Sequence, residues 1–240
     1  MKNKTHKRAL AAQATRLRLL DAAERLFAEY GVDGVPVRTI AAAAHVDVAL
    51  INYHFESKAG LFRAVFHRRA DALNAMRLQA LGGALPRARG RPDLGRVIYA
   101  LAAPNIYLRH LPDMGGLAFG RIVVREVTDP QEQKRGLVSE SFDPVVRKFM
   151  TALSQALPRA PRKALHWAYH FAIGTLIQTM ASTGRVEKLS GGACSFDDPE
   201  EVLSYLVPFI LRGMEGCVRE GGLRKPRRRK ATSSKIGRPA

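Results

Sequence analysis

The chain has 240 residues, of which 46% are hydrophobic and 7% aromatic, enough for one large or two modest globular domains. It carries 39 lysines and arginines against 21 acidic residues, and its two cysteines indicate a reducing compartment without a disulfide framework. No apolar run is long enough to span a bilayer, and the basic N-terminus lacks the apolar stretch of a signal peptide, so we expect a cytoplasmic protein.

The formal net charge of +18 is concentrated at the two ends of the chain. Residues 1–18 hold six basic residues and residues 224–240 hold eight, with no acid in either stretch, which leaves a nearly neutral body. We predict a flexible basic arm at residues 1–14 and a disordered basic tail at residues 224–240. Such segments favour DNA phosphates in a salt-dependent way, although two solvated tails without a partner remain an alternative.

Residues 15–30 form the first predicted helix, with Thr15 as its N-cap and Gly31 as its end. Apolar residues recur along one face of this segment at the spacing of an amphipathic helix. Two features favour a helical segment here, the periodic apolar face and the terminal glycine.

Residues 37–55, VRTIAAAAHVDVALINYHF, read as two short helices separated by a tight turn at residues 45–47. Asp47 is a suitable N-cap for the second helix, and His45 tolerates the left-handed backbone of a turn. A seven-residue helix is unstable alone, so outside contacts must hold it. This is the pattern of a helix-turn-helix, whose second helix enters the DNA major groove. The predicted inward-facing residues are Ile40, Ala41, Ala44, Ile51 and Phe55.

Three segments together resemble the DNA-binding domain of TetR-family transcriptional regulators: TRLRLLDAAERLFAEYG, VRTIAAAAHV and INYHFESKAGLFRAVF. The resemblance covers residues 15–66. The chain departs from it at His45, where the family usually has glycine, and at Asn52, where it usually has an aromatic residue.

The exposed face of the second short helix is predicted to contact DNA. Small or apolar residues there suit thymine methyl groups, and Asn52 suits an adenine edge. The resemblance implies phosphate contacts for Thr39, Tyr53, His54 and Lys58, which set register rather than sequence. Packing of Tyr53 and a carbonyl bond of His54 are the plainer alternatives. The predicted DNA-binding residues are Arg38, Thr39, Val48, Ala49, Leu50, Asn52, Tyr53, His54 and Lys58.

Ser57 is predicted to cap a long helix over residues 58–81, which completes a DNA-binding domain at 15–81. Residues 82–92, GGALPRARGRP, form the predicted linker. Helical patterns then run over 93–110, 113–127, 131–157, 161–183 and 199–220, with no strand alternation. The predicted fold is therefore all-α, with a helical effector-binding and dimerisation domain at 93–223.

The last two predicted helices are apolar over a wide arc, and one protein core covers only one side of a helix. A second copy would most simply cover the other side, giving a two-fold homodimer, as the TetR resemblance also implies. The alternative is a helix that is central within a monomer. The predicted interface residues are Trp167, Tyr169, Ile173, Ile177, Leu203, Leu206 and Ile210.

The segment HWAYHFAIGTLIQTMASTGRVEKLSGG resembles a TetR subgroup that includes repressors responsive to long-chain fatty acyl compounds. That resemblance implies a small apolar effector held among the C-terminal helices. Surface positions or satisfied core partners are the alternative for each polar candidate. The predicted effector-binding residues are Asn105, Arg121, His170, Phe171 and Gln178.

These observations predict a homodimeric, sequence-specific repressor that a small apolar effector releases from a palindromic operator. An activator of the same fold and a non-specific DNA-binding protein driven by its basic ends are the alternatives. No metal, cofactor or membrane partner is predicted. An enzyme is disfavoured because no GxSxG, HExxH or phosphate loop organises the serines and histidines.

Overall fold

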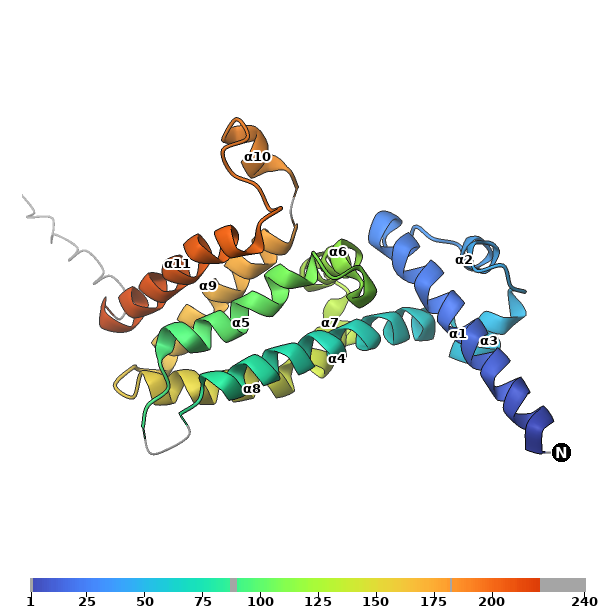
Figure 1. Ribbon diagram of the computed structural model, residues 1–240, viewed down its shortest axis with the longest axis horizontal. Coiled ribbons are helices and arrows are strands. Elements are labelled where there is room, and N and C mark those ends of the chain that lie inside the picture. The colour runs from blue at the N-terminus through green and yellow to red at the C-terminus, as the bar shows by residue number, and fades with distance from the viewer. Residues whose placement is uncertain (1, 87–89, 182, 221–240) are drawn as a thin grey trace, which may run out of the picture.

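The computed structural model describes residues 2–86, 90–181 and 183–220, all-helical apart from turns and connecting segments (Figure 1). The predicted basic tail at 224–240 lies outside this range. The helices are α1 (Lys2–Tyr30), α2 (Val37–Ala43), α3 (Ala49–Phe55), α4 (Lys58–Ala84), α5 (Leu94–Leu108), η1 (Pro112–Met114), α6 (Gly116–Thr128), α7 (Glu132–Arg135), α8 (Leu137–Ala156), α9 (Arg162–Ala181), α10 (Arg185–Leu189) and α11 (Pro199–Glu220).

The N-terminal helices share one hydrophobic core with the first half of α4. α1 packs against α2 and α4, and α3 packs against the start of α4. The ring of Phe27 on α1 meets that of Phe62 on α4 edge to face at 5.3 Å. The predicted inward residues Ile40, Ala41, Ala44, Ile51 and Phe55 are all buried in this core.

The second core lies between α4, α5, α8, α9 and α11, which run side by side in Figure 1. α5 is buried along most of its length because α4 and α11 both pack against it. α4 is therefore the helix that belongs to both cores. α6 is a second connection, since it packs against α1 as well as against α9.

The predicted flexible arm at residues 1–14 is wrong for the part that the structure describes, because α1 begins at Lys2. Alanine, leucine, glutamine, lysine and arginine dominate this stretch, and it has no glycine or proline, so helix propensity continues the helix. Thr15 is consequently inside α1 and not at its N-cap. Residues 2–14 project past α3 at the N-terminal end of α1 (Figure 1).

Three other predicted boundaries also change. The predicted helix over 131–157 is divided into α7 and α8 at Gly136, which has φ 66°. The predicted loop after α9 contains the short helix α10. α4 continues to Ala84, three residues into the predicted linker, because Gly82 and Gly83 extend the helix instead of breaking it.

Candidate DNA-binding interface and effector domain

The turn between α2 and α3 has the local bonds that a helix-turn-helix requires. His45 adopts φ 53°, in the left-handed region, as expected for the residue that replaces glycine there. Asp47 Oδ1 accepts the backbone N–H of Ala49 at 2.7 Å, so this carboxylate stabilises the start of α3 as predicted. Ser57 Oγ accepts the N–H of Gly60 at 3.0 Å and caps α4 in the same way.

Two buried side chains anchor α3 to the body of the protein. Ile51 and Phe55 lie four residues apart and are both buried in the N-terminal core. The guanidinium of Arg16 lies over the Phe55 ring, 5.2 Å from its centroid, which joins α1 to the C-terminal end of α3. The opposite face of α3 is consequently turned outward.

The outward face of α3 carries most of the predicted DNA-binding residues. Tyr53 is 77% exposed, which excludes the alternative that it is a packing residue. His54 is half-buried, with its ring edge-to-face against Tyr53 at 5.0 Å. Leu50 is half-buried against the core and offers only part of its side chain to a partner. The remaining exposed candidates on α2, α3 and the turn are Arg38, Thr39, Val48, Ala49 and Asn52.

Lys58 is positioned by the loop after α1. Its Nζ donates to the backbone carbonyl of Asp33 at 3.4 Å, and the residue is half-buried. This bond holds the ammonium group near the start of α4, beside the C-terminal end of α3. A cation there suits a backbone phosphate.

A buried ion cluster joins α1 to α4, and sequence reasoning missed it. Glu24 is 3% exposed and accepts hydrogen bonds from Arg68 Nη2 at 2.5 Å and Arg69 Nη2 at 2.8 Å. Arg69 Nη1 also donates to the carbonyl of Asp113, at 2.6 Å, in η1 before α6. We call Glu24, Arg68 and Arg69 the Glu24 cluster. The available signal was a glutamate within the apolar face of the first helix.

A second cluster fixes the end of α6. Arg135 Nε and Nη2 donate to the two carboxylate oxygens of the buried Glu126, and Nη2 also donates to Asp129 at 2.6 Å. The hydrogen bond to Glu126 is the main reason that the pKa of Arg135 is raised. Arg125 points the other way and donates to the carbonyl of Glu29 on α1 at 2.8 Å. Hydrogen bonds therefore connect both ends of α6 to the N-terminal helices: Arg69 of α4 bonds Asp113 just before α6, and Arg125 near its end bonds Glu29 of α1.

Only one of the five predicted effector-binding residues lies inside the C-terminal helices. Asn105 is buried and accepts a hydrogen bond from Arg77 Nη2 at 2.5 Å. The other four predicted residues are exposed in the free chain, because helix rotation turns their side chains outward on α6 and α9, and their role in effector binding stays a prediction. They are Arg121, His170, Phe171 and Gln178.

Two hollows border the C-terminal core. The first, which we call the α5–α6–α9 cavity, is mainly apolar and has room for about 20 Å³ of solvent. Its lining includes Asn105, Arg109, Leu117, Met180 and Phe196. The second is an open groove of about 730 Å³ between α8 and α9, bordered by Asp143, Arg147, His166 and Tyr169 among others.

The predicted dimer interface is partly wrong. Leu203, Leu206 and Ile210 are buried in the C-terminal core of the chain itself, where they cannot contact a partner. Tyr169 and Ile173 also pack against that core, and Ile177 is half-buried.

Trp167 is the predicted interface residue that lies fully on the outside, and other aromatic residues join it. Trp167 stacks on Phe171 at 5.6 Å, and on α11 Tyr205 is 74% and Phe209 68% exposed. α9 and α11 pack side by side, and we call their exposed aromatic residues Trp167, Phe171, Tyr205 and Phe209 the α9–α11 face. Sequence reasoning named residues of α11 that are buried, whereas Tyr205 and Phe209 are the exposed aromatic residues of that helix.

The described residues contain no group of three or more histidine, cysteine or acidic side chains that could hold a metal ion. Within the same ranges, none of the helices combines the length and apolar character that membrane crossing requires.

Two family models match the chain. Residues 19–65 match the model described as "Bacterial regulatory proteins, tetR family", and residues 99–213 match "Tetracyclin repressor-like, C-terminal domain". These ranges contain the helix-turn-helix and most of the C-terminal bundle. No curated protein matches the chain in sequence.

Several crystal structures share the fold. A TetR-like transcriptional regulator from Rhodococcus sp. RHA1 has 19% identity and a TM-score of 0.56, covering 84% of this chain and 96% of that one. A TetR family transcription regulator from Marinobacter aquaeolei VT8 has 16% identity and a TM-score of 0.55, covering 89% and 98%. NalD of Pseudomonas aeruginosa, the secondary repressor of the MexAB-OprM multidrug efflux pump, has 21% identity and a TM-score of 0.55, covering 84% and 97%.

Proposed function

The chain belongs to the TetR family of bacterial regulatory proteins, and from this premise we propose that it is a homodimeric repressor released from a palindromic operator by a small apolar effector. Members of the family are DNA-binding transcription factors and not enzymes. One observation carries the proposal: α4 is shared between the core that supports the recognition helix α3 and the core of the C-terminal bundle. A conformational change in the C-terminal bundle would therefore move α4, and α4 would carry that movement to the DNA-binding face.

The outward face of α3 is the proposed reader of the operator. Asn52 would pair with an adenine edge, while Val48 and Ala49 would contact thymine methyl groups. Tyr53 and Lys58 would bind phosphates on either side and set the register of the helix. The proposed supporting contacts come from Arg38, Thr39, Leu50 and His54.

The N-terminal end of α1 would add phosphate contacts beyond the recognition helix. Residues 5–14 are exposed along their whole length, and Lys7 and Arg8 lie among them with no acid in the first 20 residues. Residues 2–14 span about 20 Å as a helix. Arg16 already contacts Phe55 of α3, so the helix leaves the body beside the DNA-binding face. We infer that this basic helix lies along the DNA flanking each half-site.

The α9–α11 face is the proposed dimer interface. Four large aromatic side chains, Trp167, Phe171, Tyr205 and Phe209, are exposed there together. An apolar surface of this kind is typical of a protein–protein contact. A two-fold axis through it would place two α3 helices about 34–36 Å apart, in successive major grooves.

Effector binding would act through α4 and α6. The Glu24 cluster ties α1 to α4 and, through Asp113, to the segment that begins α6. Movement of either helix would shift the N-terminal core as a unit and change the separation of the recognition helices. Linkage requires that the effector bind the DNA-incompetent state more tightly. The fatty acyl character of the effector stays a prediction from resemblance.

The proposal is tested by selecting DNA from a random pool at moderate salt, with the full-length chain and with a form ending at Leu223. A two-fold symmetric site recovered by both forms is expected. Recovery of no motif, with all binding lost on truncation, would instead mean that the basic tail binds DNA without sequence preference. Reporter expression with and without the protein would then separate repression from activation.

A further inference from the structure

Arg77 is a half-buried cation of the C-terminal domain, and among the described residues it has no acidic partner. It lies on α4, where Nη2 donates to Asn105 Oδ1 at 2.5 Å and the guanidinium lies over the Phe142 ring at 5.3 Å. Across the part of the chain that the structure describes, Arg77 forms no ion pair with an aspartate or glutamate within 4.0 Å. Its Nε atom is buried and has no hydrogen-bond partner there.

The two buried acidic residues of the described chain differ from Arg77, because each has a partner of opposite charge. Glu24 has two arginine partners, and Glu126 has Arg135. Leaving a charge in the interior without a counter-ion costs free energy, so natural cores rarely keep one. Burial lowers the pKa of Arg77 to about 10, which reflects the same missing counter-charge. The side chain nevertheless remains cationic at neutral pH.

Two amides hold the Arg77 guanidinium in a fixed orientation. Asn105 Nδ2 donates to the carbonyl of Leu101 and Asn74 Nδ2 to the carbonyl of Ser141, each at 2.7 Å. Because each amide nitrogen is occupied, each amide oxygen is left to face Arg77, with Asn74 Oδ1 at 3.5 Å from Nη1. Both partners are neutral, and a guanidinium has five N–H donors. Arg77 is therefore positioned like a ligand-binding group and keeps donors to spare.

Among the described residues, the titratable groups that act on Arg77 do not supply a negative charge at neutral pH. Tyr169 interacts electrostatically with Arg77, and burial raises its pKa to about 12, so it stays neutral. Asp143, whose charge acts on Tyr169, is exposed to solvent on α8. A single guanidinium matches one carboxylate, which it can bind through two parallel hydrogen bonds.

We propose that the effector is an apolar monocarboxylate whose head group binds Arg77 and whose body enters the α5–α6–α9 cavity. This rests on the proposed function, because it assigns the chemistry of the effector of that regulator. Asn105 connects the two parts, since it bonds Arg77 and also lines the cavity. The leucine, methionine and phenylalanine in the lining suit an alkyl or aromatic body.

The small size of the cavity suggests how effector binding would change DNA binding. Its 20 Å³ holds about one water, whereas ligand cavities usually measure about 300–1,000 Å³. Entry of a ligand must therefore move α6 away from α5 and α9. The opposite face of α6, with Phe119 and Ile122, packs into the N-terminal core, so that movement reaches the DNA-binding domain.

Calorimetric titration tests the proposal with two acids and their neutral counterparts: dodecanoate with dodecan-1-ol, and 1-naphthoate with 1-naphthalenemethanol. At least one acid is expected to bind the full chain tenfold or more tightly than its neutral counterpart. Arg77→Gln should remove that preference and leave the neutral compound's affinity unchanged. Equal binding of acid and neutral compound, or binding of neither acid, would overturn the proposal.

Arg109 supplies the matched control because it is the cation that borders the cavity itself, 5.5 Å from the Phe196 ring. Arg109→Gln should keep the preference for the acid. A preference that survives in Arg77→Gln, or is lost only in Arg109→Gln, would place the head group elsewhere and refute the assignment.

A second variant guards against misfolding. Arg77→Met removes the guanidinium and leaves the Oδ1 atoms of Asn74 and Asn105 without this donor, so a modest fall in melting temperature is expected. A cooperative unfolding transition and an unchanged helical circular dichroism spectrum would show that loss of acid binding is not loss of the fold. DNA binding is measured separately on the same proteins. An acid that binds through Arg77 but does not release DNA would uphold this site and refute the proposed switch.

Discussion

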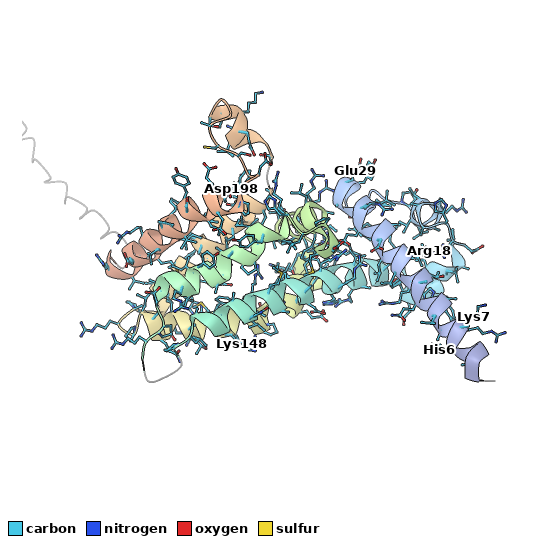
Figure 2. The ribbon with its side chains drawn as sticks, in the orientation of Figure 1. His6, Lys7, Arg18, Glu29, Lys148 and Asp198 are labelled. Atoms are coloured by element: carbon cyan, nitrogen blue, oxygen red, sulfur yellow. The ribbon has the colours of Figure 1, made fainter. Side chains whose placement is uncertain are left out.

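Removing two positive charges from the N-terminal end of α1 should lower the affinity for DNA and make that affinity less dependent on salt concentration. The change is Lys7→Ala with Arg8→Ala, which are both exposed residues of α1. Figure 2 shows Lys7 on the projecting end of the helix. Each phosphate contact contributes about 0.9 to the slope of log K against log salt. A homodimer loses four such cations, so the slope should become shallower by about 3.6.

Fluorescence anisotropy of a labelled operator duplex with extended flanks, measured from low to moderate salt, gives this slope. Arg147→Ala with Lys148→Ala is the matched control, because both residues are exposed on α8. Figure 2 shows Lys148 in the C-terminal bundle, away from the projecting end of α1. The control should leave the slope unchanged. A duplex trimmed to the two half-sites should bind wild type and the α1 variant alike, since the flanking phosphates are gone.

The helical form of the extension can be tested apart from its charge. Ala11→Gly with Ala12→Gly keeps every cation but costs about 2 kcal/mol of helix propensity in all. If a rigid helix directs the charges, this variant should also lose part of the slope. An unchanged slope in the Lys7 and Arg8 variant would refute the assignment of α1 to flanking DNA.

Four further predictions concern stability, assembly and specificity. Glu24→Gln removes the buried acid between two arginines and leaves Arg69 without an acidic partner, while Arg68 keeps Asp21; denaturant unfolding should show a loss of about 3–5 kcal/mol. Phe209→Asp should yield monomers in sedimentation without loss of helix, because the residue is 68% exposed in the free chain. Asn52→Ala should relax selection for adenine at one operator position by about 1–3 kcal/mol, seen as a less defined motif. The backbone N–H of Gln131 and the guanidinium of Arg135 lower the pKa of Asp129 from 3.8. The stabilising contribution of this carboxylate is therefore present at neutral pH and is lost as pH falls through the lowered pKa. The free energies of unfolding of Asp129→Asn and wild type should differ at pH 7, and the difference should shrink at pH 3.

The α9–α11 face illustrates the limit of reading apolar patterns. Both helices are apolar over a wide arc, and the sequence predicts correctly that some of this surface is left outside the chain's own core. It does not say which side faces α5, because that depends on how each helix is rotated in the bundle. Leu203 and Tyr205 are two positions apart on α11, yet one is buried and the other is 74% exposed.

Two charged residues that lie at contacts between helices, Arg77 and Glu24, were also not identified from the sequence. Arg77 looks like a surface position of a long helix when it is read alone, whereas Glu24 lies within the apolar face of the first helix. The partners of both side chains are distant in sequence: Asn105 for Arg77, and the pair Arg68 and Arg69 for Glu24. Only the crossing of α1, α4 and α5 brings those groups together.

The sequence by itself determined the helix-turn-helix, because its evidence is local. Apolar spacing selected Ile40, Ile51 and Phe55 as anchors, and the caps at Asp47 and Ser57 act within three residues. Tertiary structure decided the rest: which arc of α9 and α11 stays exposed, and where the unpaired cation on α4 lies. Periodicity shows that a helix has a buried side, but the neighbour that covers it is chosen by packing between segments far apart in the chain.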